Sequence, residues 1–488
     1  MASSLGDKTI SGVAWNSIDR IAHYGISFVV SIVLARLLSP EDYGLIGIIT
    51  IFITIFNAIL DGGLSTALIR KKDLTDNDCN TVFYSNIVLS IFLSLTLFFS
   101  APLIARFFER PELVDLVKVM SSILVINAFS IVQQSLLTKN INFKTQTIIS
   151  VVANVSSGVV GIALAFAGFG VWALVAQQLS ARLFTTILLW VLNKWLPKFV
   201  FSWDSFKELF GFGWKLLVTR VLSSLWGQLY QGIIGKCYSP ATLGLYTRAV
   251  QYGQLFSTGV SDVVLKVSLP VMSSIQDDRE RLLRGTRKII KTTMFVTFLV
   301  MMIMAASAKS LIFVLIGEKW LPCVPMLQIL CFNLVMNPLC YINENLLTVE
   351  GRSDKLLLLQ VYKIVITIVP LLLGIFVDIY WMLVGSAVVS WIAIVLYTYY
   401  TNKYFGYSFK DQLKDIKHSI LFSLGIAVPV YLISFIPISL YVVFALQISL
   451  ACVLVLVCGK VLKIEEYQYV KETIGSLAQK FTKNKQNR

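Results

Sequence analysis

The amino-acid sequence predicts an all-α membrane protein that crosses the bilayer many times. Of its 488 residues, 56% are hydrophobic and only 14% are charged, whereas about a quarter of the residues in a soluble domain are charged. The hydrophobic residues recur in blocks of about 20, which is the length that an α-helix needs to cross ~30 Å of hydrocarbon. Composition and block length together therefore favour membrane-spanning helices over one or two soluble cores.

We expect fourteen membrane-spanning helices. Their predicted ranges are 12–38, 44–67, 81–105, 115–138, 146–167, 170–192, 210–234, 243–272, 289–307, 324–348, 356–376, 379–400, 417–436 and 438–460. The first block contains Asp19 and Arg20 and has no small-residue cleavage site after it, so we expect the mature protein to retain it. An even number of spans places both termini on the same side of the membrane.

The distribution of basic residues predicts which side that is. With these spans, 28 Lys and Arg residues lie on the side of the N-terminus and 7 lie on the opposite side. Because Lys and Arg accumulate in the cytoplasmic loops of multispanning proteins, both termini are expected to be cytoplasmic. These loops also explain the net charge of +15, and we expect no nucleic-acid partner.

The chain repeats itself at a spacing of about 200 residues. The segment 34–45, LARLLSPEDYGL, aligns with 234–245, IGKCYSPATLGL, so that each copy has a Ser-Pro pair followed four residues later by Gly. Each repeat holds six spans, an even number, so both enter the membrane from the same side. We therefore expect two parallel six-helix lobes related by an axis along the membrane normal, as in many transporters.

The repeat divides the chain into five predicted segments. Six-helix lobes are expected over 1–192 and 210–402. Between them, 193–209 is rich in Trp and Phe with interleaved charges, which predicts an amphipathic connector helix on the cytoplasmic face. Two additional spans over 403–460 and a basic, solvated cytoplasmic tail over 461–488 lie outside the repeat.

Three segments carry a resemblance to a known family. They are KTISGVAWN from Lys8, the segment 34–45, and DGGLSTALIR from Asp61. They resemble the Wzx-type flippases of polysaccharide and lipopolysaccharide biosynthesis, which belong to the multidrug/oligosaccharidyl-lipid/polysaccharide (MOP) exporter superfamily. The resemblance runs from about residue 8 to about residue 410. It implies a V-shaped pair of lobes in the bacterial cytoplasmic (inner) membrane that moves an undecaprenyl-pyrophosphate-linked oligosaccharide to the outer leaflet by alternating access.

Seven basic residues remain inside the predicted spans when those within three residues of a span end are counted with the loops. They are Arg20, Arg182, Lys215, Arg220, Arg248, Lys266 and Lys363. A cation at mid-membrane costs roughly 2.5–3.5 kcal/mol, so most of these residues must face a wet cavity, pair with acids, or reach the interface from a span end. The acids in the spans are fewer, namely Asp19, Asp61, Asp262 and Glu344. The surplus of positive charge suits a substrate with pyrophosphate or acidic sugars, which Arg binds in bidentate fashion.

The basic residues in the spans divide into those expected to bind substrate and those that have a second explanation. Arg20 and Arg220 occupy equivalent places in the two repeats, and Arg248 lies early in the eighth span, so we expect these three to bind substrate. For three others, snorkelling from a nearby cytoplasmic span end is the alternative to substrate binding: Arg182, Lys215 and Lys363.

The acids and a histidine are candidates for charge pairing and ion coupling. Asp262 and Lys266 are spaced i,i+4, which allows them to pair on one helix face. His23, one turn from Asp19, is a candidate for proton coupling, and a neutral, hydrogen-bonded histidine is the alternative. Asp61 and Glu344 complete the set of pairing candidates, and Na⁺ or H⁺ is the expected coupling ion.

No motif indicates an enzyme or a cofactor. The outer segments near 105–115 and 307–324 carry no carboxylate pair for acid–base chemistry, and no Gly-rich phosphate loop is present. The seven Cys form no CxxC motif and the two His lie far apart, so we expect neither a disulfide framework nor a metal site. Two alternatives remain: a membrane enzyme of polysaccharide assembly, such as a polymerase or ligase, and a multidrug exporter of the same superfamily. The expected partners are a lipid-linked oligosaccharide, membrane lipids and polysaccharide assembly enzymes.

Overall fold

The computed structural model describes the backbone of residues 5–275, 277–462, 464–469 and 471–472, without the side chains of 5–14, 16–21, 258–271, 274 and 353. Throughout this part of the chain the regular structure is helical and contains no strand, which confirms the predicted all-α class. The chain divides into two compact units, unit 1 (Met1–Thr247) and unit 2 (Arg248–Arg488). Each unit is described by itself.

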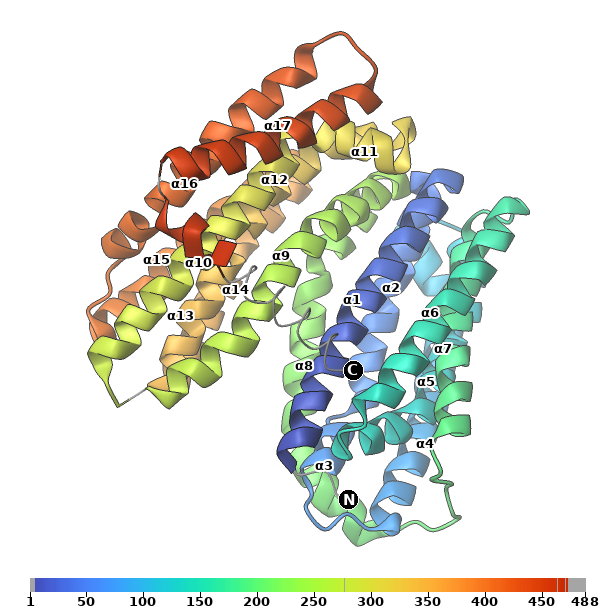
Figure 1. The fold of residues 1–488 in the computed structure, drawn as a ribbon. Helices are drawn as coiled ribbons and strands as arrows, with labels where there is room; N and C mark the ends of the chain where they lie inside the picture. Colours follow the sequence, from blue (N-terminus) through green and yellow to red (C-terminus); the bar gives the residue numbers. More distant parts are fainter. Residues whose placement is uncertain (1–4, 276, 463, 470, 473–488) are drawn as a thin grey trace, which may run out of the picture. The chain divides into compact units, whose positions relative to one another are not determined.

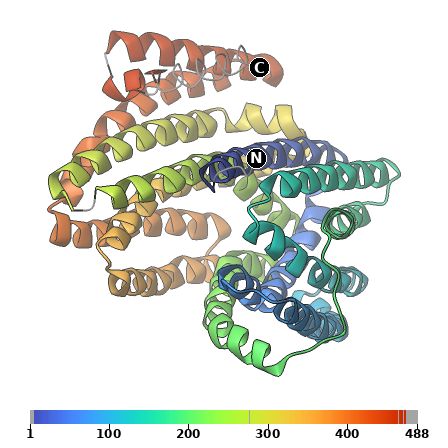
Figure 2. The same ribbon diagram turned by 60° about the horizontal axis from the view of Figure 1, so that its bottom comes forward.

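Unit 1 consists of eight helices and the first turns of a ninth. They are α1 (Leu5–Leu37), α2 (Pro40–Asp61), α3 (Leu64–Arg70), α4 (Asp76–Phe108), α5 (Leu113–Lys139), α6 (Phe143–Phe166), α7 (Val171–Leu192), α8 (Trp203–Cys237) and the start of α9 (Pro240–Ser274). Short connections pair α4 with α5 and α6 with α7, and α1 packs alongside α6, as Figures 1 and 2 show. The helix α8 packs along α2, and this contact positions the candidate site.

Unit 2 contains the rest of α9 and the helices that follow. They are α10 (Arg279–Ala306), α11 (Ala308–Ile316), η1 (Glu318–Cys323), α12 (Val324–Leu334), α13 (Asn337–Val349), α14 (Ser353–Phe376), α15 (Ile379–Phe405), α16 (Phe409–Leu432), η2 (Ile433–Phe435) and α17 (Leu440–Val461). The closest pairs are α10 with α16 and α14 with α15, and α17 packs on α16 and α11 (Figure 1).

Eleven helical segments in the described part of the chain are long and apolar enough to span a membrane. They are Pro40–Arg70, Asp76–Phe108, Leu113–Lys139, Phe143–Phe166, Val171–Leu192, Arg279–Ile316, Glu318–Val349, Asp354–Phe376, Ile379–Phe405, Phe409–Phe435 and Leu440–Val461. The protein is therefore a multi-pass membrane protein, as predicted. The three other predicted spans fall on α1, α8 and α9. Of these, α8 is fully described and is not among the eleven, whereas α1 and α9 are described only in part, and the total of fourteen stays a prediction.

The Ser-Pro pairs of the two repeats begin equivalent helices. Ser39 Oγ accepts a hydrogen bond from the Asp42 backbone N–H at 3.2 Å, and the Asp42 carboxylate accepts one from the Ser39 N–H at 2.8 Å. In the second repeat, Ser239 Oγ accepts from the Thr242 N–H at 3.2 Å. A serine N-cap followed by proline is a favourable start for a helix, because the serine satisfies a free N–H and proline has none to satisfy.

The glycines of the same repeats lie in a reciprocal contact within unit 1. A Cβ added to Gly44 would lie 2.8 Å from Pro240 Cα and closer still to the Pro240 carbonyl oxygen. A Cβ added to Gly244 would lie 2.8 Å from the Pro40 carbonyl carbon. Small residues allow membrane helices to approach this closely, and the mutual exchange of Gly and Pro supports the predicted repeat.

The connector between the predicted lobes is not a separate helix. Residues 193–202 are not helical, and α8 begins directly after them, so the prediction of an amphipathic helix over 193–209 is wrong for most of its length. The segment instead follows α4 and α5: the Lys198 N–H donates to Asn80 Oδ1 at 2.9 Å, and Gln133 Nε2 donates to the Trp195 carbonyl at 2.9 Å. The Ser202 N–H likewise donates to Thr81 Oγ1 at 3.0 Å, so side chains of α4 and α5 form hydrogen bonds that a helix would otherwise supply.

Three further segments differ from the prediction. The span expected over 44–67 is broken between α2 and α3, where Gly62 and Gly63 have φ of 52° and 69°. The span expected over 324–348 is divided between α12 and α13. The outer segment 307–324, expected as a loop, contains α11 and η1, because its LIFVLI run is apolar enough to pack as a short helix.

The beginning of the predicted tail is folded. Residues 465–469 are helical, and the side chains of Glu466 and Tyr467 are only 8% and 9% exposed. The Tyr467 ring packs against the backbone of Gly459, the C-terminal turn of α17. The expectation of a solvated tail is therefore wrong for this stretch, and residues 473–488 lie outside the described residues.

Candidate functional site

Asp61 and Arg220 form an ion pair within unit 1. The Arg220 guanidinium binds the Asp61 carboxylate, and its Nη2 donates a hydrogen bond to Thr66 Oγ1 at 3.1 Å. Asp61 is the last residue of α2, where the helix dipole disfavours a negative charge and a neighbouring cation compensates. The sequence predicted Asp61 as a pairing acid and Arg220 as a substrate-binding cation, and the structure brings the two together.

The Asp-Gly-Gly motif explains how the pair forms. Gly62 and Gly63 adopt left-handed conformations, which cost glycine nothing, and they end α2 directly after Asp61. A Cβ on Gly63 would lie 3.0 Å from Leu216 Cβ and would collide with the Gly213 carbonyl, so this turn lies directly on the backbone of α8. Arg220 is two helical turns further along α8 from Gly213, on the same side.

Further polar side chains continue from the pair along α2 and α8. We call Asn57, Asp61, Arg220, Gln228 and Gln231 the polar stripe. Asn57 is one turn before Asp61 and accepts a hydrogen bond from Asn127 Nδ2 of α5 at 2.8 Å. Gln228 and Gln231 follow Arg220 by eight and eleven residues, which places them on its side of α8. Their side-chain oxygens are buried and accept no hydrogen bond among the described residues, so the polar stripe retains hydrogen-bonding capacity.

Two more candidate cations lie in the predicted spans of unit 1. Arg182 follows the first residue of α7 by eleven residues and precedes the last by ten, and it is exposed. It therefore lies about 15 Å from either helix end, and substrate binding and snorkelling both stay predictions for Arg182. Lys215 lies twelve residues into α8 and is also exposed. Neither cation forms an ion pair in the part of the chain that the structure describes.

Among the candidates of α1 and of the second half of α9, only the side chain of His23 is described. The side chains of Arg20, Asp19, Asp262 and Lys266 lie outside the described residues, so their roles stay predictions. His23 is described: its Nδ1 accepts a hydrogen bond from Asn154 Nδ2 at 2.6 Å. His23 is thus hydrogen-bonded in the structure, and its role in proton coupling stays a prediction.

The candidates of unit 2 are dispersed. Glu344 accepts a hydrogen bond from the Tyr397 hydroxyl, a partner that the sequence gave no reason to choose. Arg248 is half-buried, eight residues after the first residue of α9, with its Nε enclosed. Lys363 is half-buried near the middle of α14 and forms no ion pair with Glu344, and substrate binding and snorkelling both stay predictions for it.

Amides of unit 2 hold helices together. Asn343 Nδ2 donates to Gln412 Oε1 at 3.1 Å, and Gln412 Nε2 donates back to Asn343 Oδ1 at 2.9 Å. Asn333 Nδ2 donates to Ser386 Oγ at 2.7 Å. Asn343 and Gln412 are fully buried, and their mutual bonds are the interhelical kind common in membrane proteins.

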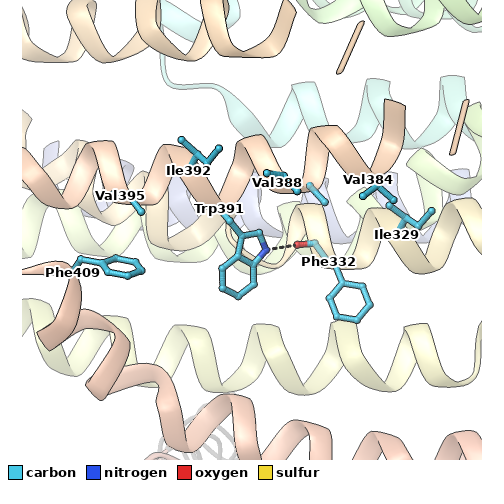
Figure 3. Close-up of a pocket in the computed structure, with 9 residues that line it drawn as sticks. Ile329, Phe332, Val384, Val388, Trp391, Ile392, Val395 and Phe409 are labelled. Atoms are coloured by element: carbon cyan, nitrogen blue, oxygen red, sulfur yellow. Dashed lines mark hydrogen bonds between the residues drawn. The ribbon is translucent and has the colours of Figure 1, made fainter. Parts of the chain in front are cut away.

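Unit 2 also contains an apolar pocket of about 490 Å³ between α12, α15 and the start of α16 (Figure 3). Its lining residues are Ile329, Phe332, Val384, Ala387, Val388, Trp391, Ile392, Val395 and Phe409. The Trp391 Nε1–H is directed to the Phe332 carbonyl at 3.3 Å, as Figure 3 shows, so its ring presents only carbon to the pocket. Such a lining suits hydrocarbon and excludes a charged head group.

The sequence matches known proteins over most of its length. Residues 33–325 match the family model described as "Polysaccharide biosynthesis protein". The teichuronic acid biosynthesis protein TuaB of Bacillus subtilis (strain 168) is 27% identical over 354 residues, which are 72% of this chain and 73% of that protein. The lipopolysaccharide biosynthesis protein WzxC of Escherichia coli (strain K12) is 23% identical over 377 residues, 76% of each chain.

Solved structures share the fold. The lipid II flippase MurJ in an inward closed conformation has a TM-score of 0.73 and 15% identity, covering 93% of this chain and 98% of its own. An inward-facing multidrug resistance MATE family transporter of the MOP superfamily has a TM-score of 0.61 and 16% identity, covering 81% of this chain and 98% of its own. At these identities the likeness concerns the fold alone.

Proposed function

The chain belongs to the polysaccharide biosynthesis protein family, and we propose that it is a flippase for an undecaprenyl-pyrophosphate-linked oligosaccharide. The resemblance to Wzx-type proteins of the MOP superfamily is confirmed by the family match and by relatives named for teichuronic acid and lipopolysaccharide biosynthesis. The shared fold is that of flippases and exporters. We further propose that the protein lies in the bacterial cytoplasmic membrane with both termini in the cytoplasm.

The observation that carries this proposal is Arg220 on the polar stripe. A guanidinium has five N–H donors, and Asp61 and Thr66 engage only part of this set. The side chain is 44% exposed, so donors remain for an incoming anion. Together with Arg182 and Lys215, it gives the predicted spans of unit 1 more positive than negative charge, which suits pyrophosphate and disfavours a cationic drug.

In the proposed cycle the protein makes and breaks no covalent bond. The pyrophosphate enters from the cytoplasm and shares the Arg220 guanidinium with Asp61, whose carboxylate holds Arg220 in place when the site is empty. Gln228 and Gln231 have buried, unpaired oxygens in the described state, and they accept hydrogen bonds from sugar hydroxyls once alternating access exposes them. Arg20 and Arg248 are proposed as further phosphate contacts, and a gradient of Na⁺ or H⁺ drives the return of the empty carrier by alternating access.

Transport by purified protein tests the proposal. Reconstituted vesicles would receive a fluorescent undecaprenyl-pyrophosphate oligosaccharide, and lectin accessibility would report its movement between leaflets. We expect Arg220→Gln to reduce the initial rate at least tenfold, while Arg106→Gln, which removes an exposed charge from the last turn of α4, leaves it unchanged.

A charge swap separates binding from structure. The double variant Arg220→Asp/Asp61→Arg keeps an ion pair but moves the cation from α8 to the end of α2. If Arg220 binds pyrophosphate, the swapped protein should fold like the unmodified protein, because the ion pair is kept, but it should not transport the oligosaccharide. Full transport in the swapped protein would contradict the assigned role, and transport of lipophilic cations instead of the oligosaccharide would identify a multidrug exporter.

A further inference from the structure

A second pocket of unit 2, of about 290 Å³, is polar and lies away from the candidates described above. It forms where the first turns of α10 and α16 meet the chain that follows α17. Its lining residues are Arg284, Arg287, Lys288, Lys291, Thr292, Asp415, Glu465, Glu466 and Tyr469. The part of α10 without charged residues begins directly after the last of its cations, so the pocket lies where charged turns give way to a membrane-spanning segment.

One wall of the pocket is positively charged. Its four cations follow one another at i, i+3, i+4 and i+7 and therefore share one face of α10. Two of them, Arg287 and Lys291, approach Asp415 only to 3.8 Å, which is beyond hydrogen-bond distance. Asp415 instead accepts a hydrogen bond from the Tyr407 hydroxyl at 2.8 Å. The other two cations, Arg284 and Lys288, form no ion pair in the described part of the chain.

The wall contributed by the chain after α17 is negatively charged. Glu465 and Glu466 lie on the short helical stretch 465–469, which Tyr467 holds against the end of α17. Neither glutamate comes within 4.0 Å of a cationic nitrogen among the described residues. The ring of Tyr469 lies 4.0 Å from Lys288 Nζ and joins the two walls at one edge.

We propose that this pocket binds an aminoalkyl phosphate, such as the head group of phosphatidylethanolamine. A simple anion would be attracted by the cations of α10 but repelled by both glutamates. A simple cation would be attracted by the glutamates but repelled by the cations of α10. A molecule that carries a phosphate and a primary ammonium a few bonds apart satisfies both walls at once. The phosphate accepts charge-assisted hydrogen bonds from Arg284 and Lys288, and the ammonium donates to Glu465 and Glu466.

The position of the pocket at the start of an apolar span favours a lipid head group as the source, although free phosphoethanolamine has the same chemistry. Native mass spectrometry of the full-length protein in detergent distinguishes these sources. The probes are dioctanoyl phosphatidylethanolamine, dioctanoyl phosphatidylglycerol, dioctanoyl phosphatidylcholine and free O-phosphoethanolamine. We expect the ethanolamine lipid to bind most tightly, because glycerol carries no charge and choline has no N–H to donate. Tighter binding of free O-phosphoethanolamine would identify the soluble compound as the ligand.

Variants of the two walls give opposite results. Arg284→Gln/Lys288→Gln should weaken binding of both the ethanolamine and the glycerol lipid at least tenfold. Glu465→Gln/Glu466→Gln should weaken the ethanolamine lipid at least tenfold and leave the glycerol lipid unchanged or tighter. The matched control removes two charges from the same helix outside the pocket, Arg279→Gln/Arg281→Gln, and should change either affinity less than twofold.

Two results would overturn the proposal. One is equal affinity for the ethanolamine and glycerol lipids in the unmodified protein, which would mean that the glutamates contact no ammonium. The other is an equal loss of affinity in the control and in Arg284→Gln/Lys288→Gln, which would reduce the effect to the general charge of α10. Thermal unfolding of each variant would verify that the change in affinity does not arise from loss of folded protein.

Discussion

The contact between Gly44 and Pro240 makes the sharpest prediction for stability. A methyl group on Gly44 would lie 2.8 Å from Pro240 Cα and closer to its carbonyl oxygen, whereas Cβ atoms essentially never approach other atoms within 3.0 Å. The obstructing atoms belong to the backbone, so no side-chain rotation relieves the overlap, and the two helix ends must move apart. Overpacking of this kind costs about 1–3 kcal/mol.

The substitution also has a favourable component. Replacing glycine by alanine inside a helix stabilises it by up to about 1 kcal/mol. Backbone collisions relax least, so the cost for Gly44→Ala lies at the upper end of the overpacking range, about 3 kcal/mol. Subtracting the gain of about 1 kcal/mol leaves an expected net destabilisation of about 2 kcal/mol. The matched control is Gly232→Ala in α8, where an added Cβ meets nothing within 4 Å and only the favourable component remains.

Thermal unfolding followed by tryptophan fluorescence measures the difference between the two variants. We expect Gly44→Ala to unfold several degrees below the unmodified protein, and Gly232→Ala to unfold at the same temperature or slightly higher. Gly244→Ala should behave like Gly44→Ala, and the double variant should lose less than the sum, because both methyl groups separate the same helix ends. A Gly44→Ala protein as stable as Gly232→Ala would refute the close approach and, with it, the structural equivalence of the repeats.

Two further predictions concern the loops of unit 1. Lys71 Nζ lies 3.0 Å from the Asp78 carboxylate, which is only 1% exposed, and 2.9 Å from Glu208; Lys71→Met leaves Asp78 without its cation and should cost about 1–3 kcal/mol of stability. The hydrogen bond with Glu208 raises the pKa of Lys71 above its ordinary value of 10.5, so this stabilisation is complete below pH 10.5 and is lost as the pH rises through the folded-state pKa. Thermal unfolding at pH 7 and at high pH checks this, and a difference between Lys71→Met and the unmodified protein that does not shrink at high pH would contradict it. Gln133→Leu removes the donor to the Trp195 carbonyl, so limited proteolysis should cut the connector faster than in the unmodified protein; an unchanged rate would mean that this bond does not fix the connector.

Sequence patterns were sufficient for the helices and insufficient for their interruptions. Apolar blocks of span length located the membrane helices because burial in lipid requires continuous hydrophobic segments with internally satisfied backbones. The break between α2 and α3 depends on Gly62 and Gly63 adopting left-handed conformations, and hydropathy does not register two glycines in an apolar block. The connector at 193–202 was mistaken for a helix because its Trp and Phe residues suggest an amphipathic face, whereas its hydrogen bonds go to side chains from distant parts of the chain.

The sequence identified Asp61 and Arg220 as candidates, but it did not predict that they form an ion pair with each other. Counting charges within spans identified Asp61 and Arg220, because each is costly in a membrane whatever its partner. Their pairing depends on the packing of α8 along α2, and no local pattern links two residues so far apart in sequence. The glutamines Gln228 and Gln231 were not recognised, since a polar residue in a helix becomes informative only when its hydrogen-bond partners are known.

The polar pocket of unit 2 was not predicted from the sequence, because the positive-inside rule already accounted for its basic residues. The basic residues of α10 supported the cytoplasmic orientation, and that role explained them without a ligand. The glutamates that face them come from the predicted tail, whose composition indicated a solvated segment. Only the packing of Tyr467 on Gly459 brings Glu465 and Glu466 to the pocket.

Controlled depletion of the protein in its host cell tests the central claim most directly. The quantity to measure is the amount of complete lipid-linked oligosaccharide in each leaflet of the cytoplasmic membrane. A flippase predicts that complete units accumulate on the inner leaflet, and that the unmodified protein relieves this accumulation while Arg220→Gln does not. Units that reach the outer leaflet and remain unpolymerised would contradict the account and identify the protein as an enzyme of polysaccharide assembly.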